Sequence, residues 1–468
     1  MSKRADQGKQ ARRRQPRSAL GRYSAAIDRP EPVAVLLAQD EQRVAALTPM
    51  RHRRMAASPF SFYRGGAAIM VGDLGARPST GLHTQLCGDA HVANFGLFAA
   101  PDRTVVFDVN DFDETNPGPF EWDVLRLATS FTVAGPEIGL SRAQMRDAAW
   151  AAARGYREQI DRQSRSSDLA NWYERINVGF LDAWSKGEGR AAAKTLKHSV
   201  AKADTRDIWS AVDKMTKVVK GTRELINQPP LVLRFPLDGG AAERLEEIMH
   251  AYVASMPVDR AELLGRYRIV DMGHKVVGVG SVGLLALVVL LQGRDENDVI
   301  ALQAKQAVSS VLEPFTGESS FADHGQRVVV GQQLMQAATD PLLGWVTPRS
   351  GRSFYLRQLR DKKYAPDISR MKPTAVVDYA LLCGRALARA HARAGDPIAI
   401  SAYVGKGHSF MKAVVDFAFG YGEQVHLDYQ AYTEEIARGR VDIGAEDDGR
   451  HLVITTDSTG RITIKNEY

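Results

Sequence analysis

Acidic and amide side chains with the spacing of a phosphoryl-transfer loop lie between residues 86 and 114. Asn94 follows Asp89 by five positions, and a β-branched run at 104–109 leads into an acidic cluster that contains Asp108 and Asp111. Phosphoryl transfer needs a carboxylate beside the attacking hydroxyl, and oxygen ligands from Asn and Asp for the Mg²⁺ on the phosphates. The spacing therefore predicts that Asp89 is the catalytic carboxylate and that Asn94 holds the metal together with a second ligand from Asp108, Asn110, Asp111 or Asp113.

A purely structural interpretation of the same residues stays open. Asp and Asn favour turns and strand ends, so Asp89 and Asn94 could shape a turn while the acids cap a strand. His91 is interpreted either as a hydrogen-bonded loop histidine or as a metal ligand. The ordered succession of loop, strand, acidic cluster and Trp122-Asp123 helix start favours the catalytic interpretation.

This segment resembles the catalytic segment of aminoglycoside and choline phosphotransferases, the small-molecule branch of the protein-kinase-like fold. The similarity is carried by Gly88-Asp89-x-His91-x-x-Asn94, Asn110-Asp111-Phe112 and Trp122-Asp123. It implies that Asp89 is the catalytic residue, that Asn94 and Asp111 bind magnesium, and that Asp123 braces the loop. Cys87 replaces the usual first His of that motif, and Asp108 competes with Asp111 for the metal.

Over most of its length the chain resembles an uncharacterised bacterial family, domain of unknown function 2252. The motifs that carry this resemblance are Ser58-Pro59-Phe60-x-Phe62-Tyr63-Arg64-Gly65 and Leu86-Cys87-Gly88-Asp89-Ala90-His91. This resemblance implies no established activity.

A Gly-x-Gly-x-x-Gly pattern occurs at residues 278–283, in a context of strands. An apolar run and a charged turn follow it where a dinucleotide-binding loop would need a helix. The pattern therefore favours the glycine-rich hairpin of kinases, with Lys305 at the end of the next strand contacting the nucleotide phosphates. A tight turn with a surface lysine is the alternative. The residues expected at the cofactor are Gly278, Gly280, Ser281, Gly283, Lys305 and its acidic partner Glu313, with Glu318 behind it.

The order of these motifs is reversed relative to ordinary kinases. The glycine pattern and Lys305 follow the catalytic loop by almost two hundred residues, whereas in kinases they precede it. A circular permutation accounts for this order, as does a swap of lobes between two protomers. The helix expected at 379–393, which carries His391, resembles the helix that precedes the catalytic loop in phosphotransferases. The strand at 354–359 is then expected to be the hinge that holds adenine.

The sequence thus predicts an α+β chain with a circularly permuted, protein-kinase-like two-lobed fold. A small antiparallel sheet forms the nucleotide lobe, and the large lobe is mostly helical. The expected divisions are a disordered basic tail (1–22), a helical large lobe with the catalytic and metal loops (23–260), a β-rich nucleotide lobe (261–360), and the rest of the large lobe with a terminal hairpin (361–468).

The composition fits an ordinary globular protein of 468 residues with 44% hydrophobic residues and a net charge of +6. The longest apolar run, 282–292, is about half of a membrane span. Two cysteines cannot form a disulfide framework or a structural zinc site. We therefore expect a cytoplasmic protein without a membrane partner. Nucleic acid is not an expected partner despite the basic tail.

These features predict an ATP- and Mg²⁺-dependent phosphotransferase that acts on a hydroxyl group of a small molecule, with a homodimer possible. Three alternatives stay open. Two keep the fold, namely a nucleotide-binding pseudokinase and an enzyme that transfers AMP. The third is a metal-dependent phosphoester hydrolase that uses His91, Asp108, Asp111 and Asp113.

Overall fold

The structure is a computed structural model of the full chain. It describes residues 2–177, 179–181, 208–229, 232–235, 241–275, 282–349, 351–359, 366–444, 452–456 and 462–466.

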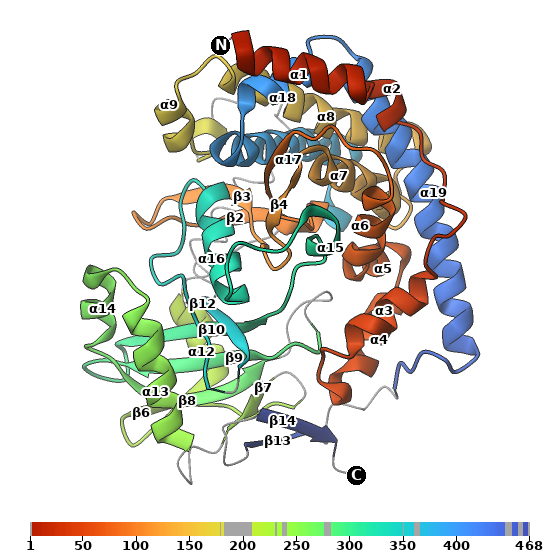
Figure 1. The fold of residues 1–468 in the computed structure, drawn as a ribbon. Coiled ribbons are helices and arrows are strands. Elements are labelled where there is room, and N and C mark those ends of the chain that lie inside the picture. Colours follow the sequence, from red (N-terminus) through yellow and green to blue (C-terminus); the bar gives the residue numbers. More distant parts are fainter. Residues whose placement is uncertain are drawn as a thin grey trace.

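A large helical part combines segments from both ends of the chain (Figure 1). Its N-terminal helices are α1 (Ser2–Arg14), α2 (Arg17–Leu20), α3 (Pro32–Asp40), η1 (Ala45–Leu47), α4 (Thr48–Ala56), α5 (Pro59–Gly65) and α6 (Ala67–Gly75). The helices that follow are η2 (Val92–Asn94), α7 (Glu121–Ala134), α8 (Arg142–Gln163) and α9 (Asp168–Tyr173). The C-terminal ones are η3 (Ile368–Arg370), α17 (Pro373–Ala394), α18 (Pro397–Val404) and α19 (Ser409–Ala437).

Two small antiparallel pairs are set into this helical part and carry the predicted loop. β1 (His83–Leu86) pairs with β4 (Asn116–Pro119), and β2 (Phe95–Ala99) pairs with β3 (Val105–Val109). Helices α8 and α17 cross closely behind them, since a Cβ at Gly384 would lie 2.0 Å from the carbonyl oxygen of Ala152. The segment that carries the predicted loop therefore adjoins two closely packed helices.

A six-stranded antiparallel sheet forms the core of the second part, with the order β11-β12-β10-β9-β8-β7. Its strands are β7 (Val232–Arg234), β8 (Arg268–Lys275), β9 (Ala286–Gln292), β10 (Val299–Ala307), β11 (Gly344–Val346) and β12 (Ser353–Gln358). The helices of this part are α12 (Ile208–Met215), α13 (Ala241–Ala254), α14 (Val258–Leu264), α15 (Glu313–Thr316) and α16 (His324–Met335). Two further pairs are β5 (Thr216–Val219) with β6 (Thr222–Leu225) and β13 (Leu452–Thr456) with β14 (Ile462–Asn466).

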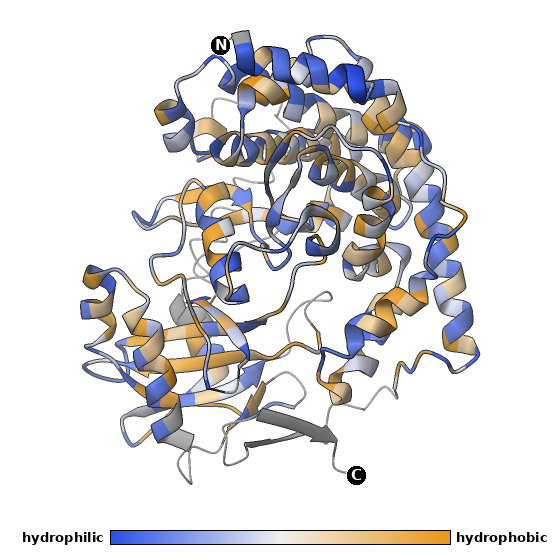
Figure 2. Ribbon diagram, viewed as in Figure 1, coloured by the Kyte–Doolittle hydropathy of each residue, from blue (hydrophilic) through white to orange (hydrophobic). Residues whose placement is uncertain are grey.

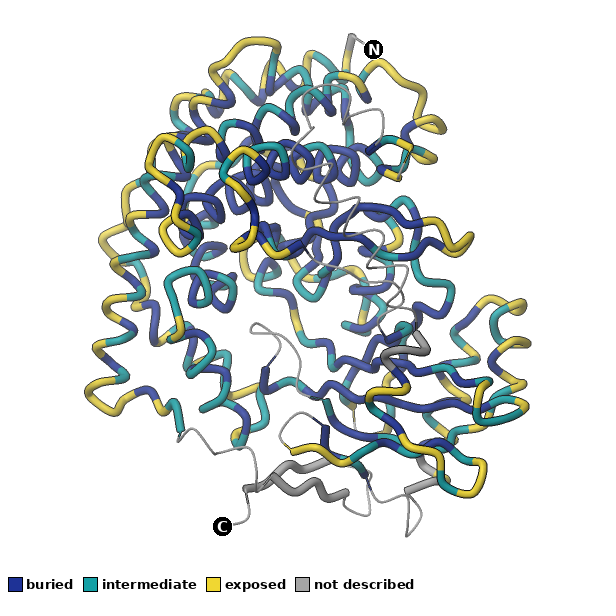
Figure 3. The backbone as a smooth tube through the Cα atoms, turned by 180° about the vertical axis from the view of Figure 1, so that it is seen from behind, coloured by how far each residue is buried: buried dark blue, intermediate teal, exposed yellow. Residues whose placement is uncertain are grey.

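The central strand β9 is buried along its whole length, which explains its continuous apolar sequence. Leu287 and Val289 pack into the same cluster as Tyr252 of α13, whereas Val288 and Leu290 pack on the opposite side. Figure 2 shows the hydrophobic residues gathered in this sheet, and Figure 3 shows burial running through the sheet and the centre of the helical part.

The expected disordered tail is wrong. Residues 2–14 form helix α1, which packs on α18. Ala11 is fully buried, and a Cβ at Gly8 would lie 2.0 Å from the carbonyl oxygen of Ala399. Because most residues of this segment are charged or polar, its composition does not reveal the face of small residues that packs on α18. Arg4 also pairs with Asp396 at 2.7 Å.

Most expected elements are present, including helix α17, the strand β12 and the terminal hairpin. The sheet, however, begins earlier in the chain than the expected boundary at residue 261. β7 lies within the stretch expected to be helical, and α13 packs against the sheet. Strands of three or four residues carry too few alternations to be recognised in a charged segment. In the described part of the chain, no helix is long and apolar enough to cross a membrane.

Candidate active site

The loop that follows β1 is held by a carboxylate from helix α7. Asp123 accepts hydrogen bonds from the backbone N–H groups of Cys87 at 2.9 Å and Gly88 at 3.1 Å. The ring Nε2 of His391, near the end of α17, lies 3.2 Å from the same carboxylate. Asp123 is buried, so these contacts are not shared with water. It therefore braces the loop, as the resemblance to phosphotransferases implies.

Gly88 is required by the path of this loop. Its φ of +81° lies in the left-handed region, and a Cβ would lie 2.5 Å from the carbonyl oxygen of Glu114. The close contact brings Glu114 directly against the residue that precedes Asp89. The two acidic segments of the predicted site are therefore neighbours in space.

Asp89 lies in a strongly positive environment. Two nitrogens of Arg126 on α7 lie 2.5 and 2.6 Å from its Oδ1, and Nε2 of His91 is 3.5 Å from its Oδ2. Burial raises the pKa of Asp89 above its ordinary value, although Arg126 and Arg64 act against this shift. Burial together with Arg64 and Arg126 lowers the pKa of His91 well below 6.5, so the imidazole is neutral near pH 7.

The β2–β3 pair places Asn94 beside Asp111. Phe95 is opposite Val109, and the backbone N–H of Asn110 donates to the carbonyl oxygen of Asn94 at 2.9 Å. The Nδ2 group of Asn94 donates to the carbonyl oxygen of Asp89 at 2.8 Å, which leaves its amide oxygen available as a ligand. The predicted metal ligands Asn94 and Asp111 therefore lie at the same end of one hairpin, next to Asp89.

Asp108 is unsuited to the metal role that the sequence leaves open for it. Both of its carboxylate oxygens lie 2.6 Å from Nη2 of Arg389, and its side chain is 3% exposed. In a strand, successive side chains point to opposite faces, and Asp108 faces the interior of the helical part. Asp111, whose side chain is 37% exposed, lines the cavity, whereas Asp108 does not.

Lys305 from β10 reaches across to the hairpin segment. Its Nζ lies 2.5 Å from Oδ2 of Asp113 and 4.0 Å from Oδ1 of Asp111. The hydroxyl of Tyr355 on β12 donates to the other oxygen of Asp113 at 2.5 Å. Burial alone would raise the pKa of Asp113, but Lys305 and Tyr355 hold it below its ordinary value. The predicted convergence of Lys305 and Asp111 thus occurs within one chain.

Glu313, the expected acidic partner of Lys305, makes other contacts. Its Oε1 accepts from the backbone N–H of Ser310 at 3.0 Å and lies 3.6 Å from Nε of Arg327. It sits on the one-turn helix α15 and caps its own segment. Asp113 occupies the partner position instead, and nothing in the local sequence around Lys305 indicates a residue so distant in the chain.

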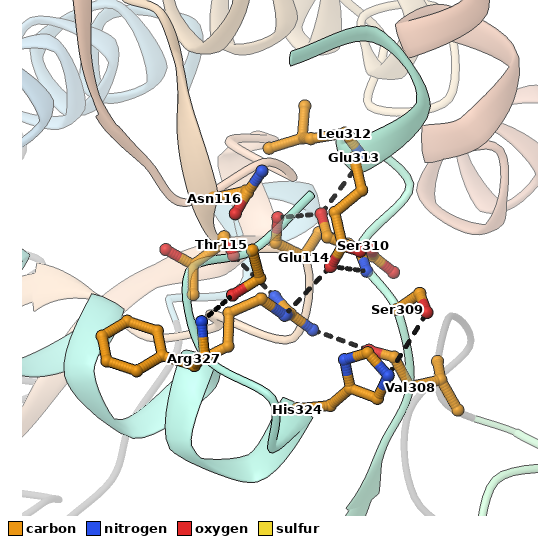
Figure 4. A network of polar contacts seen from close by, with 12 residues as sticks. Glu114, Thr115, Asn116, Val308, Ser309, Ser310, Leu312, Glu313, His324 and Arg327 are labelled. Carbon is orange, nitrogen blue, oxygen red and sulfur yellow. Dashed lines mark hydrogen bonds and ion pairs between the residues drawn. The ribbon is translucent and has the colours of Figure 1, made fainter. Parts of the chain in front are cut away.

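A polar network joins the acidic segment to the connection between β10 and α16 (Figure 4). Arg327 donates to the carbonyl oxygens of Thr115 at 2.6 Å, Asp113 at 2.9 Å and Val308 at 2.7 Å. Glu114 accepts from the backbone N–H of Val311 at 2.8 Å. Burial raises the pKa of Glu114 to about 7. The network fixes the position of the sheet relative to the acidic segment that follows β3.

A cavity of about 450 Å³ opens between these segments. Asp89, Asp111, Asp113 and Glu114 line it from the helical part, and Leu284 and the segment 306–311 line it from the sheet side. Arg64, Ala67 and Ala68 complete the wall near Asp89, with further small and apolar residues of α3, α6 and α15.

The donor set suits a magnesium ion that is shared with phosphates. No group of three or more His, Cys, Asp or Glu residues within the described ranges could hold a metal ion. Mg²⁺ is commonly bound by one or two carboxylates together with substrate phosphates, so Asp111 with Asn94 fits such an ion. The set expected for a metal hydrolase is not assembled, because Asp108 pairs with Arg389 and Asp113 with Lys305.

Three of the four predicted glycine-loop residues, Gly278, Gly280 and Ser281, lie outside the described residues. Gly283 has a φ of +94°, and its carbonyl oxygen accepts from the N–H of Val44 at 2.7 Å. Arg43 donates to the carbonyl oxygen of Val282 at 2.5 Å. The segment before α4 therefore anchors the C-terminal end of the glycine pattern beside the cavity.

Arg64 and Arg126 are residues of the site that the spacing of the motifs does not predict. Both are basic side chains that reach it from helices, α5 and α7, and neither follows the catalytic spacing. For Arg64 a signal was present, because it stands in the motif 58–65 that no predicted role explained.

Comparison with protein families gives one match. The family model described as "Uncharacterized protein conserved in bacteria (DUF2252)" matches residues 43–435. The chain belongs to this family. The match includes α5, the loop that carries Asp89, the sheet and α17, whereas the part of the cavity wall formed by α3 lies outside it. No curated protein and no solved structure matches the chain.

Proposed function

We propose that this chain is an ATP- and Mg²⁺-dependent phosphotransferase that acts on a hydroxyl group of a small molecule. The observation that carries the proposal is that Asp89, Asp111 and Asp113 line one cavity, while Lys305 pairs with Asp113 at 2.5 Å and lies 4.0 Å from Asp111. A lysine from a sheet, a metal-type acid and a base-type acid are the components that phosphoryl transfer requires.

Each residue has a role that follows from its position. Asp89 orients the acceptor hydroxyl and takes its proton, because it lines the cavity at the end of the braced loop. Asp111 and Asn94 hold Mg²⁺, which when bound neutralises charge on the phosphates. Lys305 contacts the nucleotide phosphates from the sheet side. Asp113 keeps Lys305 charged and oriented, the role of the helix glutamate in protein kinases.

The arrangement of elements supports a kinase-like fold with permuted order. Lys305 lies on the third strand of the meander β8-β9-β10, and helix α16 follows before β11 and β12. In kinases, the phosphate-binding lysine is likewise on the third strand and precedes a helix. The end of α17 also lies beside β1, where Thr84 donates to the carbonyl oxygen of His391 at 3.1 Å. In a kinase whose elements follow the ordinary order, the chain would run directly from the end of this helix into the strand before the catalytic loop.

A second candidate is a nucleotide-binding protein without turnover. The close pairing of Asp89 with Arg126 favours it, because a carboxylate engaged by a guanidinium is a weaker base. The pKa of Asp89 is nevertheless raised, because the effect of burial is larger than the opposing effect of Arg126. A raised pKa makes Asp89 a stronger base, which argues against this candidate.

The test is magnesium-dependent ATP turnover with a panel of hydroxyl compounds, followed by separation of ADP from AMP and pyrophosphate. We expect ADP and a phosphorylated acceptor, with turnover lost in Asp89→Asn and Lys305→Ala. Asp102→Asn is the matched control, because Asp102 is an exposed loop acid outside the cavity lining. Unchanged turnover in both site variants would contradict the proposal. AMP and pyrophosphate would select AMP transfer, and nucleotide binding without turnover would select the second candidate.

A further inference from the structure

Arg64 on α5 is a cation of the cavity wall that the roles above leave unused. Its side chain is half-buried, and its Nε is enclosed without a hydrogen-bond partner. Within the described ranges, Arg64 makes neither a hydrogen bond nor an ion pair. Burying part of a guanidinium without a hydrogen-bond partner costs free energy. A role of Arg64 in binding a ligand would offset this cost.

The neighbouring cations are engaged by protein groups. Arg126 is held by Asp89, and Lys305 by Asp113. Arg43 donates to the carbonyl oxygen of Val282. Arg64 instead lies in the electrostatic field of three acids, Asp89, Asp111 and Glu137, and forms an ion pair with none of them. Arg64 therefore lines the same cavity as the proposed base Asp89 and the proposed metal ligand Asp111.

We propose that Arg64 binds the phosphoryl group during its transfer, a role that rests on the phosphotransferase function proposed above. In that reaction the acceptor oxygen forms a bond to the γ-phosphorus while the bond from this phosphorus to the β,γ-bridging oxygen breaks. The hydroxyl proton passes to Asp89, and ADP leaves with the electron pair of the broken bond. The transferring group lies between the base and the metal, in the cavity that Arg64 lines together with Asp89 and Asp111.

Arginine suits this task because its planar fork donates to two phosphate oxygens at once. An arginine that stabilises the charge of a transferring phosphoryl group increases turnover by about 10³-fold or more. Such a residue acts on the transition state, so its loss lowers kcat and leaves nucleotide affinity nearly unchanged.

The surrounding motif is built to hold Arg64 in place. Ser58 caps α5 by accepting from the N–H of Ser61 at 3.1 Å, and Gly65 packs so closely that a Cβ would lie 2.6 Å from Sδ of Met55. The ring of Tyr63 lies 4.4 Å from the guanidinium of Arg126. One short helix thus positions Arg64 directly and supports the arginine that holds Asp89.

The experiment compares the full chain with Arg64→Ala and Arg64→Lys. The probes are ATP turnover and binding of ADP with Mg²⁺ and aluminium fluoride, a mimic of the transferring phosphoryl group. We expect kcat to fall about 10³-fold in Arg64→Ala, with ATP affinity retained and ADP–aluminium fluoride binding lost. Added guanidinium should restore part of the turnover of Arg64→Ala, because the removed side chain leaves space open to the cavity. A structural role alone would produce neither this split nor this rescue.

The control is Arg142→Ala, which removes a 69% exposed arginine outside the cavity lining. It should behave as the unaltered chain does. If both Arg64 variants keep full kcat and bind ADP–aluminium fluoride while the unaltered chain is active, the role of Arg64 is overturned and the proposed function stands. If the unaltered chain neither turns over ATP nor binds ADP–aluminium fluoride, the proposed function fails, and the role of Arg64 fails with it.

Discussion

The ammonium of Lys305 lies 2.5 Å from a carboxylate oxygen of Asp113, although 192 residues separate them in the chain. This pair joins the sheet to the hairpin that follows the catalytic loop. Burial lowers the pKa of Lys305, but Asp113 more than offsets this effect and keeps the lysine charged. The contact therefore links the assembly of the two parts to the charge state of the site.

Replacing only one member of this pair should destabilise the protein more, per residue replaced, than replacing both members together. We expect Lys305→Met alone and Asp113→Asn alone each to lower the free energy of unfolding by about 3 kcal/mol, because a buried charge loses its partner. The double variant should be less destabilised than the sum of the two. Urea unfolding of all four proteins measures this coupling, and additive losses would show that the pair is not a unit.

Loss of the Asp89 carboxylate should affect turnover and spare nucleotide binding. Asp89→Asn keeps the shape of the side chain but cannot accept the hydroxyl proton, so we expect kcat to fall about 10³-fold. Its contact with Arg126 weakens, because the guanidinium then faces a neutral group. Single-turnover assays and calorimetric titration with ATP measure the two effects. A variant that loses ATP affinity and turnover equally would argue for a structural role of Asp89.

Glu114 should make stability depend on pH. Burial raises its pKa from 4.5 to about 7, so the folded chain holds a proton between these values that the unfolded chain releases. Its contribution to stability is complete below pH 4.5 and is lost as the pH rises through 7. Glu114→Gln keeps a neutral side chain at every pH. Between pH 5 and pH 8, the free energy of unfolding of Glu114→Gln should therefore rise by about 3 kcal/mol relative to that of the unaltered chain.

Urea unfolding at these two pH values measures the effect of Glu114→Gln. Glu434→Gln is the control, because this side chain is 64% exposed on α19. A difference between Glu114→Gln and the unaltered chain that stays constant from pH 5 to pH 8 would contradict the assigned protonation.

The local parts of the site follow from the sequence, because they are encoded within short segments. Asp89, Asn94 and Asp111 lie on one loop and one hairpin, and the turn at Gly88 closes them against Glu114. Asp123 is predictable for the same reason, since a helix start follows the hairpin at once. The choice between Asp108 and Asp111 needed the structure, because only tertiary packing brings Arg389 to Asp108.

The contacts that sequence reasoning missed join segments far apart in the chain. Asp113 replaces Glu313 as the partner of Lys305 because the hairpin, and not the local helix, packs against β10. Arg64 enters the cavity from a helix that precedes the catalytic loop and has no spacing relationship to it. Periodicity and motif spacing describe neighbours along the chain, so neither pairing could be derived from them.

The N-terminal helix α1 offers a sharp test of the fold, because its packing depends on one glycine. A Cβ at Gly8 would lie 2.0 Å from the carbonyl oxygen of Ala399, whereas Gln10 is exposed on the same helix. Alanine is the better helix former by about 1 kcal/mol, so Gly8→Ala would favour an isolated helix. Against α18 the added methyl group must displace α1, and we expect a loss of about 2 kcal/mol. Trypsin should then cleave more rapidly after Arg13 in Gly8→Ala than in the unaltered chain or in Gln10→Ala. Equal cleavage of all three proteins would show that α1 is not docked on α18.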